Sequence, residues 1–141
     1  MVEILVADDH PLFQYAITDF VERNIPDTKT ISCIDLEEAL NTAEENPDID
    51  LVLLDLNMPK MNGLEFLRNL NKHPLVIITT AYREYAIESY ELEVLDYLVK
   101  PIPFNRFLKS INKLTARLMT LNGIKQAVDF DQDPHIFLKA T

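Results

Sequence analysis

The sequence predicts a doubly wound α/β domain built on a five-stranded parallel sheet. Short apolar runs recur along the chain and are flanked by polar or helix-like stretches, as in strands that are buried on both faces of a sheet. Strand-like and helix-like segments alternate five times, which is typical of right-handed βαβ units. The 141 residues are enough for one domain with a substantial buried core.

The apolar runs define the predicted strands. They cover about residues 2–7, 29–33, 51–54, 75–79 and 96–99.

A helix is predicted after each strand. These helices are expected from about residue 11, and at about 35–46, 62–70, 83–92 and 104–121. In the first helix, Leu12, Ala16 and Phe20 have the spacing of a single face. In the second helix, Asp35 is expected to be the N-cap, with Glu38 three residues later.

The last predicted helix has the clearest pattern, with apolar residues at three-and-four spacing from Phe104 to Leu121. Its first half is expected to pack on the core, and its second half could serve either the core or a partner. Residues 1–121 are therefore predicted to form one domain. Residues 122–141, which contain several aspartates and a proline, are predicted to be a linker and the possible start of a second, truncated domain.

The composition excludes several classes of function. A formal net charge of −10 argues against direct nucleic-acid binding, which needs clustered Lys and Arg. Two glycines are too few for a dinucleotide-binding loop or a Walker A loop. The single cysteine, Cys33, is expected to be a small buried hydrophobe. No membrane-length apolar run and no secretory leader are present, so we expect a cytoplasmic protein with no membrane partner.

Polar residues suited to phosphate or magnesium chemistry lie at the ends of four predicted strands. Their positions are Asp8–Asp9, Asp55, Thr80 and Lys100. In a parallel α/β sheet, ligands bind outside the carboxyl ends of the strands, so these side chains are expected to converge.

The expected group has a coherent chemistry. Three neighbouring carboxylates repel one another unless a cation neutralises them, and an all-oxygen ligand set favours Mg²⁺ (or Mn²⁺). An aspartate can attack a phosphoryl group to form an aspartyl phosphate. Lys100 would hold one phosphoryl oxygen as a point charge, and the Thr80 hydroxyl would donate to another.

The same residues form a pattern that resembles a known family. The pattern consists of Asp8-Asp9, Asp55-Leu-Asn57-Met58-Pro59 followed by Gly63, Thr80-Ala81, and Lys100-Pro101. It resembles the receiver (CheY-like) domain of bacterial two-component response regulators over about residues 2–121. The resemblance implies a flavodoxin-like fold with strand order 2-1-3-4-5.

The resemblance also implies a metal site. Asp9 and Asp55 would be direct magnesium ligands, with the backbone carbonyl of Asn57 as a third ligand and Asp8 acting through water. His10 is adjacent and could be read as a ligand, but a loop-facing position beside the pocket is favoured.

The resemblance further implies a phosphorylation switch. Asp55 would be the phosphoacceptor for a sensor histidine kinase, with Lys100 binding the phosphate and Thr80 as the switch hydroxyl. The bond before Pro101 is expected to be cis. Tyr97 matches the family's switch aromatic, although a core tyrosine on the fifth strand is the alternative.

If the Thr80 side chain moved toward a phosphoryl oxygen, it would leave space into which the Tyr97 ring could rotate. The face formed by the fourth helix, fifth strand and fifth helix would then change shape and control homodimerisation or an output domain. Tyr82, two residues after Thr80, could shield the phosphoryl group, which favours slow self-dephosphorylation.

The two ends of the chain resemble different subfamilies. Residues 7–12 resemble receivers with LuxR- or NarL-type helix-turn-helix outputs. Residues 79–104 resemble receivers joined to LytTR-type DNA-binding domains, and Ile136–Lys139 resembles the opening strand of such a domain, so the LytTR reading is favoured. DNA would be contacted only through an output domain outside this chain.

Two other classes of function compete with the switch. A phosphatase with an aspartyl nucleophile would usually carry an acid two residues after it, but Asn57 stands there and cannot donate a proton. A pseudo-receiver that is never phosphorylated would act only as a protein-interaction module, and the full acidic set with Lys100 argues against that. The sequence therefore predicts a switch and not a turnover enzyme.

Overall fold

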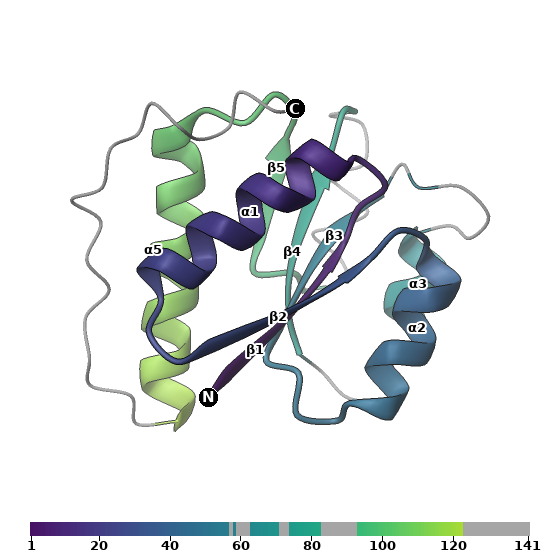
Figure 1. Cartoon of the computed structure of the whole chain (residues 1–141), viewed down its shortest axis with the longest axis horizontal. Helices are drawn as coiled ribbons and strands as arrows, with labels where there is room; N and C mark the ends of the chain where they lie inside the picture. Colours follow the sequence, from purple (N-terminus) through teal and green to yellow (C-terminus); the bar gives the residue numbers. More distant parts are fainter. Residues whose placement is uncertain (57, 59–62, 71–73, 83–92, 123–141) are drawn as a thin grey trace.

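The structure, a computed structural model, describes residues 1–56, 58, 63–70, 74–82 and 93–122 (Figure 1). The predicted fourth helix at 83–92, the tail from residue 123, and Asn57 lie outside the described residues.

The described part contains one parallel sheet of five strands with the order β2-β1-β3-β4-β5. The strands are β1 (Val2–Ala7), β2 (Thr28–Cys33), β3 (Leu51–Asp55), β4 (Leu75–Thr80) and β5 (Asp96–Val99). The predicted fold class and strand order are confirmed. Every predicted strand is present, and β3 and β4 each extend one residue further to include Asp55 and Thr80.

Helices cover both faces of this sheet. They are α1 (Pro11–Asn24), α2 (Leu36–Glu45), α3 (Gly63–Arg68) and α5 (Phe104–Asn122). Figure 1 shows α1 and α5 on one side of the sheet and α2 and α3 on the other. None of these helices is both long and apolar enough to cross a membrane.

A local signal in the sequence explains where α2 begins. The Asp35 side chain accepts a hydrogen bond of 2.8 Å from the Glu38 backbone N–H, so the predicted N-cap of α2 is confirmed. The prediction for α3 was too long, because this helix ends at Arg68 and the chain leaves it through a turn at Asn69.

The predicted core face of α1 was partly wrong. Leu12 is 70% exposed, whereas Phe13, Ile17 and Val21 are buried. These three residues repeat every four positions and form the stripe that meets the sheet, while Phe20 extends it toward α5. Leu12 lies one position before this stripe, about 100° around the helix, and therefore faces solvent.

The sheet separates two hydrophobic clusters, because successive strand residues point to opposite faces. Ile4, Val6 and Leu53 face α1 and α5, where Phe107 meets Phe20 edge-to-face at 5.4 Å between ring centroids. The other cluster packs β-strand residues against α2 and α3; its fully buried members include Leu5, Leu54, Ile78, Leu36 and Phe66. On α5, burial continues as far as Leu118, so the described second half of that helix also serves the core.

The register of the strands brings their carboxyl ends to one edge of the sheet. Asp55 on β3 lies beside Thr79 on β4, and Thr80 lies beside Val99 on β5. The loops that follow β1, β3, β4 and β5 therefore start from the same edge, where the candidate site lies.

Candidate functional site: an acidic pocket at the carboxyl edge of the sheet

The centre of the site is a pair of buried carboxylates. Asp8 follows β1, and its backbone N–H donates to the Cys33 carbonyl at 3.1 Å, which ties the loop to β2. Asp55 is the last residue of β3. The Asp8 and Asp55 side chains are only 2% and 1% exposed, whereas that of Asp9 is 35% exposed. Two buried carboxylates require compensation, because burial of an unpaired charge is costly.

Lys100 supplies part of this compensation. Its Nζ lies 2.8 Å from Asp8 Oδ2 and 3.4 Å from Asp55 Oδ2. The ammonium also lies 4.5 Å from the centroid of the Phe13 ring, so an aromatic face from α1 borders it. The bond between Lys100 and Pro101 is cis, as predicted.

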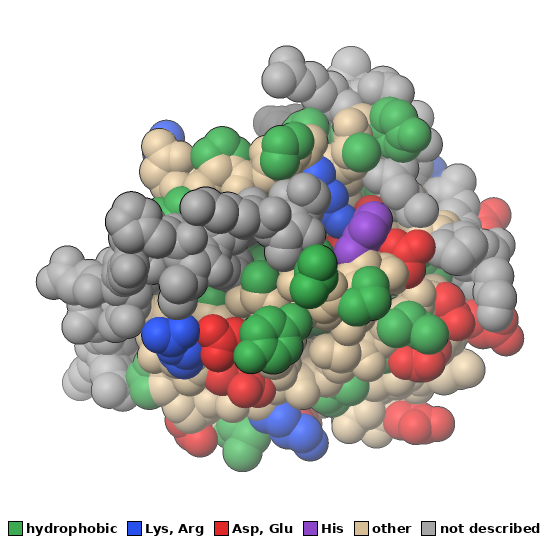
Figure 2. Space-filling model, turned by 45° about the horizontal axis from the view of Figure 1, so that its top comes forward, with side chains coloured by type: hydrophobic (Ala, Val, Ile, Leu, Met, Phe, Trp, Pro, Cys, Tyr) green, Lys and Arg blue, Asp and Glu red, His purple; other side chains and the backbone are tan. Residues whose placement is uncertain are grey.

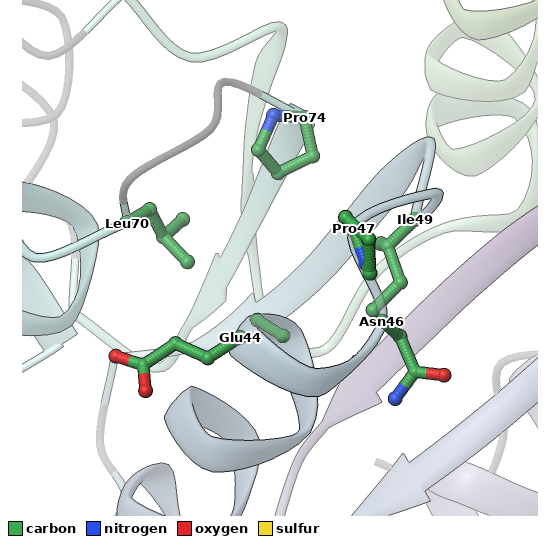
Figure 3. A pocket seen from close by; sticks show the side chains of 7 residues that line it. Glu44, Asn46, Pro47, Ile49, Leu70 and Pro74 are labelled. Carbon is green, nitrogen blue, oxygen red and sulfur yellow. The ribbon is translucent and has the colours of Figure 1, made fainter.

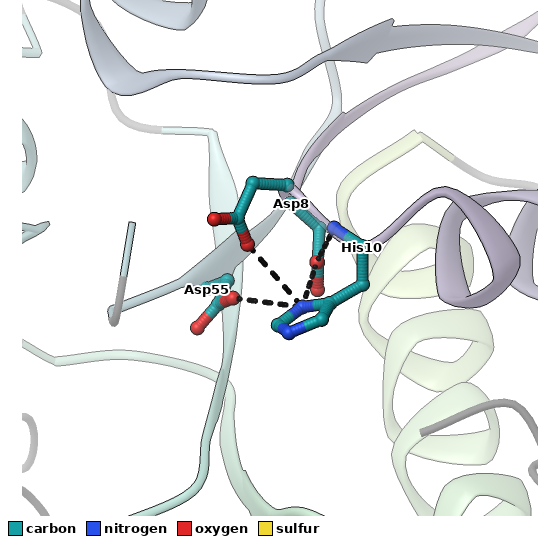
Figure 4. A group of neighbouring side chains, drawn as sticks. Asp8, His10 and Asp55 are labelled. Atoms are coloured by element: carbon teal, nitrogen blue, oxygen red, sulfur yellow. Dashed lines mark hydrogen bonds and ion pairs between the residues drawn. The ribbon is translucent and has the colours of Figure 1, made fainter. Parts of the chain in front are cut away.

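The His10 imidazole enters the same pocket (Figure 4). Its Nδ1 lies 2.8 Å from Asp8 Oδ1, 3.3 Å from Asp9 Oδ1 and 3.6 Å from Asp55 Oδ2. The expectation that His10 stays beside the pocket is therefore only half right. The side chain is 57% exposed, but Nδ1 points at the carboxylates.

The backbone around His10 explains this position. The residue that precedes a proline is driven toward extended conformations, and His10 has φ −98° and ψ 106° before Pro11. Its backbone N–H donates to Asp8 Oδ1 at 2.8 Å. The side chain makes no capping bond to α1 and so can point toward the carboxylates.

A chain of hydrogen bonds links the predicted switch residues. Thr80, fully buried, accepts a bond of 3.1 Å at its Oγ1 from the Tyr82 backbone N–H. The Tyr82 carbonyl accepts a bond of 2.5 Å from the Tyr97 hydroxyl. Tyr97 is partly buried against the α2–α3 cluster, so its ring has one packed side and one hydrogen-bonded end. The backbone of Tyr82 thus joins Thr80 to Tyr97.

A buried charge cluster joins β5 to α5, and the sequence patterns gave no signal for it. The Asp96 carboxylate, 5% exposed, accepts bonds of 2.9 and 2.7 Å from the two terminal nitrogens of Arg106, and Ser110 also donates to it. Burial alone would raise the pKa of Asp96, but the hydrogen bonds from Arg106, Ser110 and the Tyr97 backbone outweigh burial and hold the pKa well below its ordinary range.

Cys33 is buried beside α2, as predicted. Burial, which outweighs a hydrogen bond with Thr42, raises the pKa of its thiol to about 11, so this side chain stays neutral.

The pocket residues fit a divalent cation. Asp8, Asp9, His10 and Asp55 can each offer one ligand atom, and these atoms all lie within 4.8 Å of one another. Carboxylate oxygens are the ligands that Mg²⁺ prefers, and a cation would offset the repulsion between the buried carboxylates. The predicted third ligand, the Asn57 carbonyl, lies outside the described residues.

Figure 2 shows that a histidine lies at the surface, with acidic and basic side chains beside it and hydrophobic side chains close by. His10 is the one histidine among the described residues. Leu12 and Tyr15 on α1 are 70% and 73% exposed. The acidic pocket is therefore open to solvent through His10, next to a helix that exposes large hydrophobic side chains.

A second hollow lies at the opposite edge of the sheet, where α2 and α3 end before β3 and β4 (Figure 3). Its volume is about 220 Å³, which is less than a typical small-molecule site. The lining residues are Ala43, Glu44, Asn46, Pro47, Ile49, Leu70 and Pro74. They offer one carboxylate and no cluster of polar groups, so the carboxyl edge remains the candidate site.

Comparison with known proteins gives one matching family. The sequence profile of the response regulator receiver domain matches residues 4–112. An uncharacterized response regulatory protein of Vibrio cholerae is 34% identical over 117 residues, which are 81% of this chain and 45% of the relative. The sensory transduction protein LytT of Oceanobacillus iheyensis is 28% identical over 134 residues, 91% of this chain and 54% of LytT. The chain thus spans about half the length of these relatives.

A solved structure with the same fold is a complex that contains magnesium. The response regulator TrrA of Thermotoga maritima, described as a complex with Mg²⁺ and BeF, is 29% identical and has a TM-score of 0.68. The match covers 81% of this chain and 99% of TrrA.

Proposed function

This chain belongs to the response regulator receiver domain family, and on that premise we propose that Asp55 accepts a phosphoryl group from a histidine kinase. One observation carries the proposal. The Asp55 carboxylate is 1% exposed and lies 3.4 Å from the Lys100 ammonium, in a pocket that two further aspartates share. A carboxylate held against a cation at a strand end is positioned to attack phosphorus.

The transfer needs little from the protein beyond positioning and neutralisation of charge. An Asp55 carboxylate oxygen forms the new bond to phosphorus, the bond from phosphorus to the kinase imidazole nitrogen breaks, and that nitrogen keeps the electron pair and takes a proton. Lys100 moves from the shared Asp8 contact to a phosphoryl oxygen. A magnesium ion held by Asp9, Asp55 and the Asn57 carbonyl, with Asp8 through water, would offset charge on the phosphoryl oxygens.

The hydrogen bonds among Thr80, Tyr82 and Tyr97 support a route for the signal. A phosphoryl oxygen near Thr80 would draw its hydroxyl toward Asp55 and alter the bond to the Tyr82 N–H. Because the Tyr82 carbonyl holds the Tyr97 hydroxyl, movement of this segment would release or redirect the Tyr97 ring. Tyr97 is part of β5, so the change would reach the face that includes β5 and α5.

We extend the proposal to the whole protein in outline. In this proposal residues 1–121 form the receiver and residues 122–141 lead to an output domain, for which the resemblance of residues 79–104 to LytTR-type receivers suggests a DNA-binding function. Phosphorylation would favour a homodimer through the fourth helix, β5 and α5. Light scattering of the chain with Mg²⁺ and beryllofluoride should then give the mass of a dimer, and the mass of a monomer would contradict the proposed homodimer.

The composition, with its single cysteine, supports a cytoplasmic location.

The chain is a signalling module and not a classical enzyme. The remaining alternatives are a pseudo-receiver and, more weakly, a phosphatase. Asn57, two residues beyond Asp55, cannot donate a proton to a leaving group, which disfavours multiple turnover.

One assay separates these functions. The chain and Asp55→Asn are incubated with Mg²⁺ and a small acyl phosphate, and protein-bound phosphate and free phosphate are followed over time. We expect about one acid-labile phosphate per chain, absent in the variant, with slow release. Rapid release over many turnovers would instead support a phosphatase. The absence of both labelling and release in a folded protein would support a pseudo-receiver.

A further inference from the structure

We propose that His10 is a nitrogen ligand of the cation in the acidic pocket, and that it shifts the preference of the site from Mg²⁺ toward later transition-metal ions such as Ni²⁺. The inference rests on the metal site of the proposed function and adds a residue that sets its selectivity.

The geometry of the pocket carries the inference. His10 Nδ1 lies 2.8, 3.3 and 3.6 Å from one oxygen each of Asp8, Asp9 and Asp55. Two ligand atoms that bind one ion at about 2.1 Å, in neighbouring octahedral positions, lie about 3 Å apart. The nitrogen is thus already at ligand spacing from the carboxylates, and a cation placed among them would contact it after small movements.

The backbone holds His10 in a suitable position before any ion binds. Pro11 restricts its main chain, and the His10 N–H is bonded to Asp8 Oδ1. Figure 4 shows Nδ1 turned toward the carboxylates and the other ring nitrogen turned away. A neutral imidazole can carry its proton on that outer nitrogen and leave the Nδ1 lone pair for a metal.

Lys100 does not occupy the same side of Asp8. Its ammonium binds Asp8 Oδ2, whereas His10 faces Oδ1. The ammonium lies 3.3 Å from His10 Nδ1, so both groups border the same carboxylates. A cation on the Oδ1 side would leave the Lys100 contact to Oδ2 in place.

Ligand chemistry gives the direction of the effect. Carboxylate, carbonyl and water ligands suit Mg²⁺ and Mn²⁺, whereas an imidazole nitrogen suits ions later in the first transition series. Affinity for a site with nitrogen rises from Mn²⁺ to Co²⁺ and Ni²⁺. Removal of the His10 nitrogen should therefore weaken the binding of Ni²⁺ most, that of Mn²⁺ less and that of Mg²⁺ least.

The test uses a background in which His10 is the only histidine. The chain has three histidines, so His73→Gln and His135→Gln are introduced together. Pulsed electron paramagnetic resonance of bound Mn²⁺ then reports a directly coordinated nitrogen. Dissociation constants for Mg²⁺, Mn²⁺ and Ni²⁺ are measured in this background, with His10→Phe, and with His10→Ala as a second variant. Far-ultraviolet circular dichroism checks that each variant is folded.

We expect nitrogen modulation of the Mn²⁺ signal that either substitution removes. We also expect about a tenfold or greater loss of Ni²⁺ affinity with at most a threefold change for Mg²⁺. The inference is overturned if the nitrogen signal is absent, or if the substitutions tighten all three ions equally, since His10 would then merely fill the ion's place. If the protein in which His10 is the only histidine binds none of the three ions, the metal site of the proposed function is itself wrong. Metal binding with an unchanged ion preference would overturn this inference alone.

Discussion

Lys100 and the two buried aspartates form one electrostatic unit. Asp8 and Asp55 are only 2% and 1% exposed, burial of an unpaired charge is costly, and Lys100 contacts both carboxylates. In the proposed function, the same ammonium is drawn to a phosphoryl oxygen. The contacts that stabilise the pocket without a ligand are therefore those that phosphorylation would rearrange.

The side chain of Tyr82 provides a residue-scale prediction. It is 50% exposed and follows Thr80 by two positions, so its ring can shield the phosphoryl group from water. We expect Tyr82→Ala to hydrolyse aspartyl phosphate severalfold faster than the unmodified chain, measured by loss of protein-bound phosphate. Tyr15→Ala, which removes a 73% exposed ring on α1, is the matched control. Equal hydrolysis rates in both variants and the unmodified chain would rule out shielding by Tyr82.

At the residue scale, the sequence predicted where the site residues lie better than it predicted how their side chains are oriented. Asp8, Asp55, Thr80 and Lys100 could be placed because each directly follows an apolar strand, and parallel strands end at one edge. The inward turn of the His10 ring could not be predicted, because it depends on a side-chain rotation and on carboxylates that are distant in the sequence. The proposed roles of all these residues remain predictions.

At the scale of helices and strands, features set by neighbouring residues could be predicted, and features set by tertiary packing could not. The N-cap of α2 was predictable because Asp35 and Glu38 are three residues apart in the sequence. The core face of α1 was not, because both Leu12 and Phe13 are apolar and only packing of the helix against the sheet selects Phe13. Similarly, the pairing of Asp96 with Arg106 depends on how α5 lies on β5, a tertiary arrangement.

The Asp96 cluster leads to a prediction for acid stability. The folded-state pKa of Asp96 is lowered, so its contribution to stability is fully present above the unfolded-state pKa of about 4 and is lost as the pH falls below it. We expect Asp96→Asn to lower the free energy of unfolding by about 1–3 kcal/mol near pH 6, with a smaller difference near pH 3. Urea unfolding at a series of pH values measures this difference.

Asp19→Asn is the matched control, because Asp19 forms a salt bridge with Arg23 at the surface of α1 and should have little effect at either pH. A deficit for Asp96→Asn that stays constant from pH 6 to pH 3 would contradict the assignment of the effect to the charged carboxylate.

At the scale of the whole molecule, the topology explains why residues far apart in the sequence share one site. The order β2-β1-β3-β4-β5 places β1 beside the central strand β3, with β4 on the other side of β3 and β5 next to β4. Lys100 thus contacts Asp8 across 92 positions of sequence. Alternating strand and helix patterns were sufficient to predict this fold class, because right-handed βαβ units leave few other arrangements.

The central claim is that the pocket directs a phosphoryl group to Asp55, and peptide mapping tests it most directly. The chain is treated with Mg²⁺ and a small acyl phosphate, the acyl phosphate on the protein is reduced with borohydride, and the peptides are sequenced by mass spectrometry. We predict homoserine at position 55 alone, and none after treatment without the phosphodonor. Homoserine at position 8 or 9 with Asp55 unmodified, or no reduced aspartate in a chain that carries acid-labile phosphate, would contradict the account.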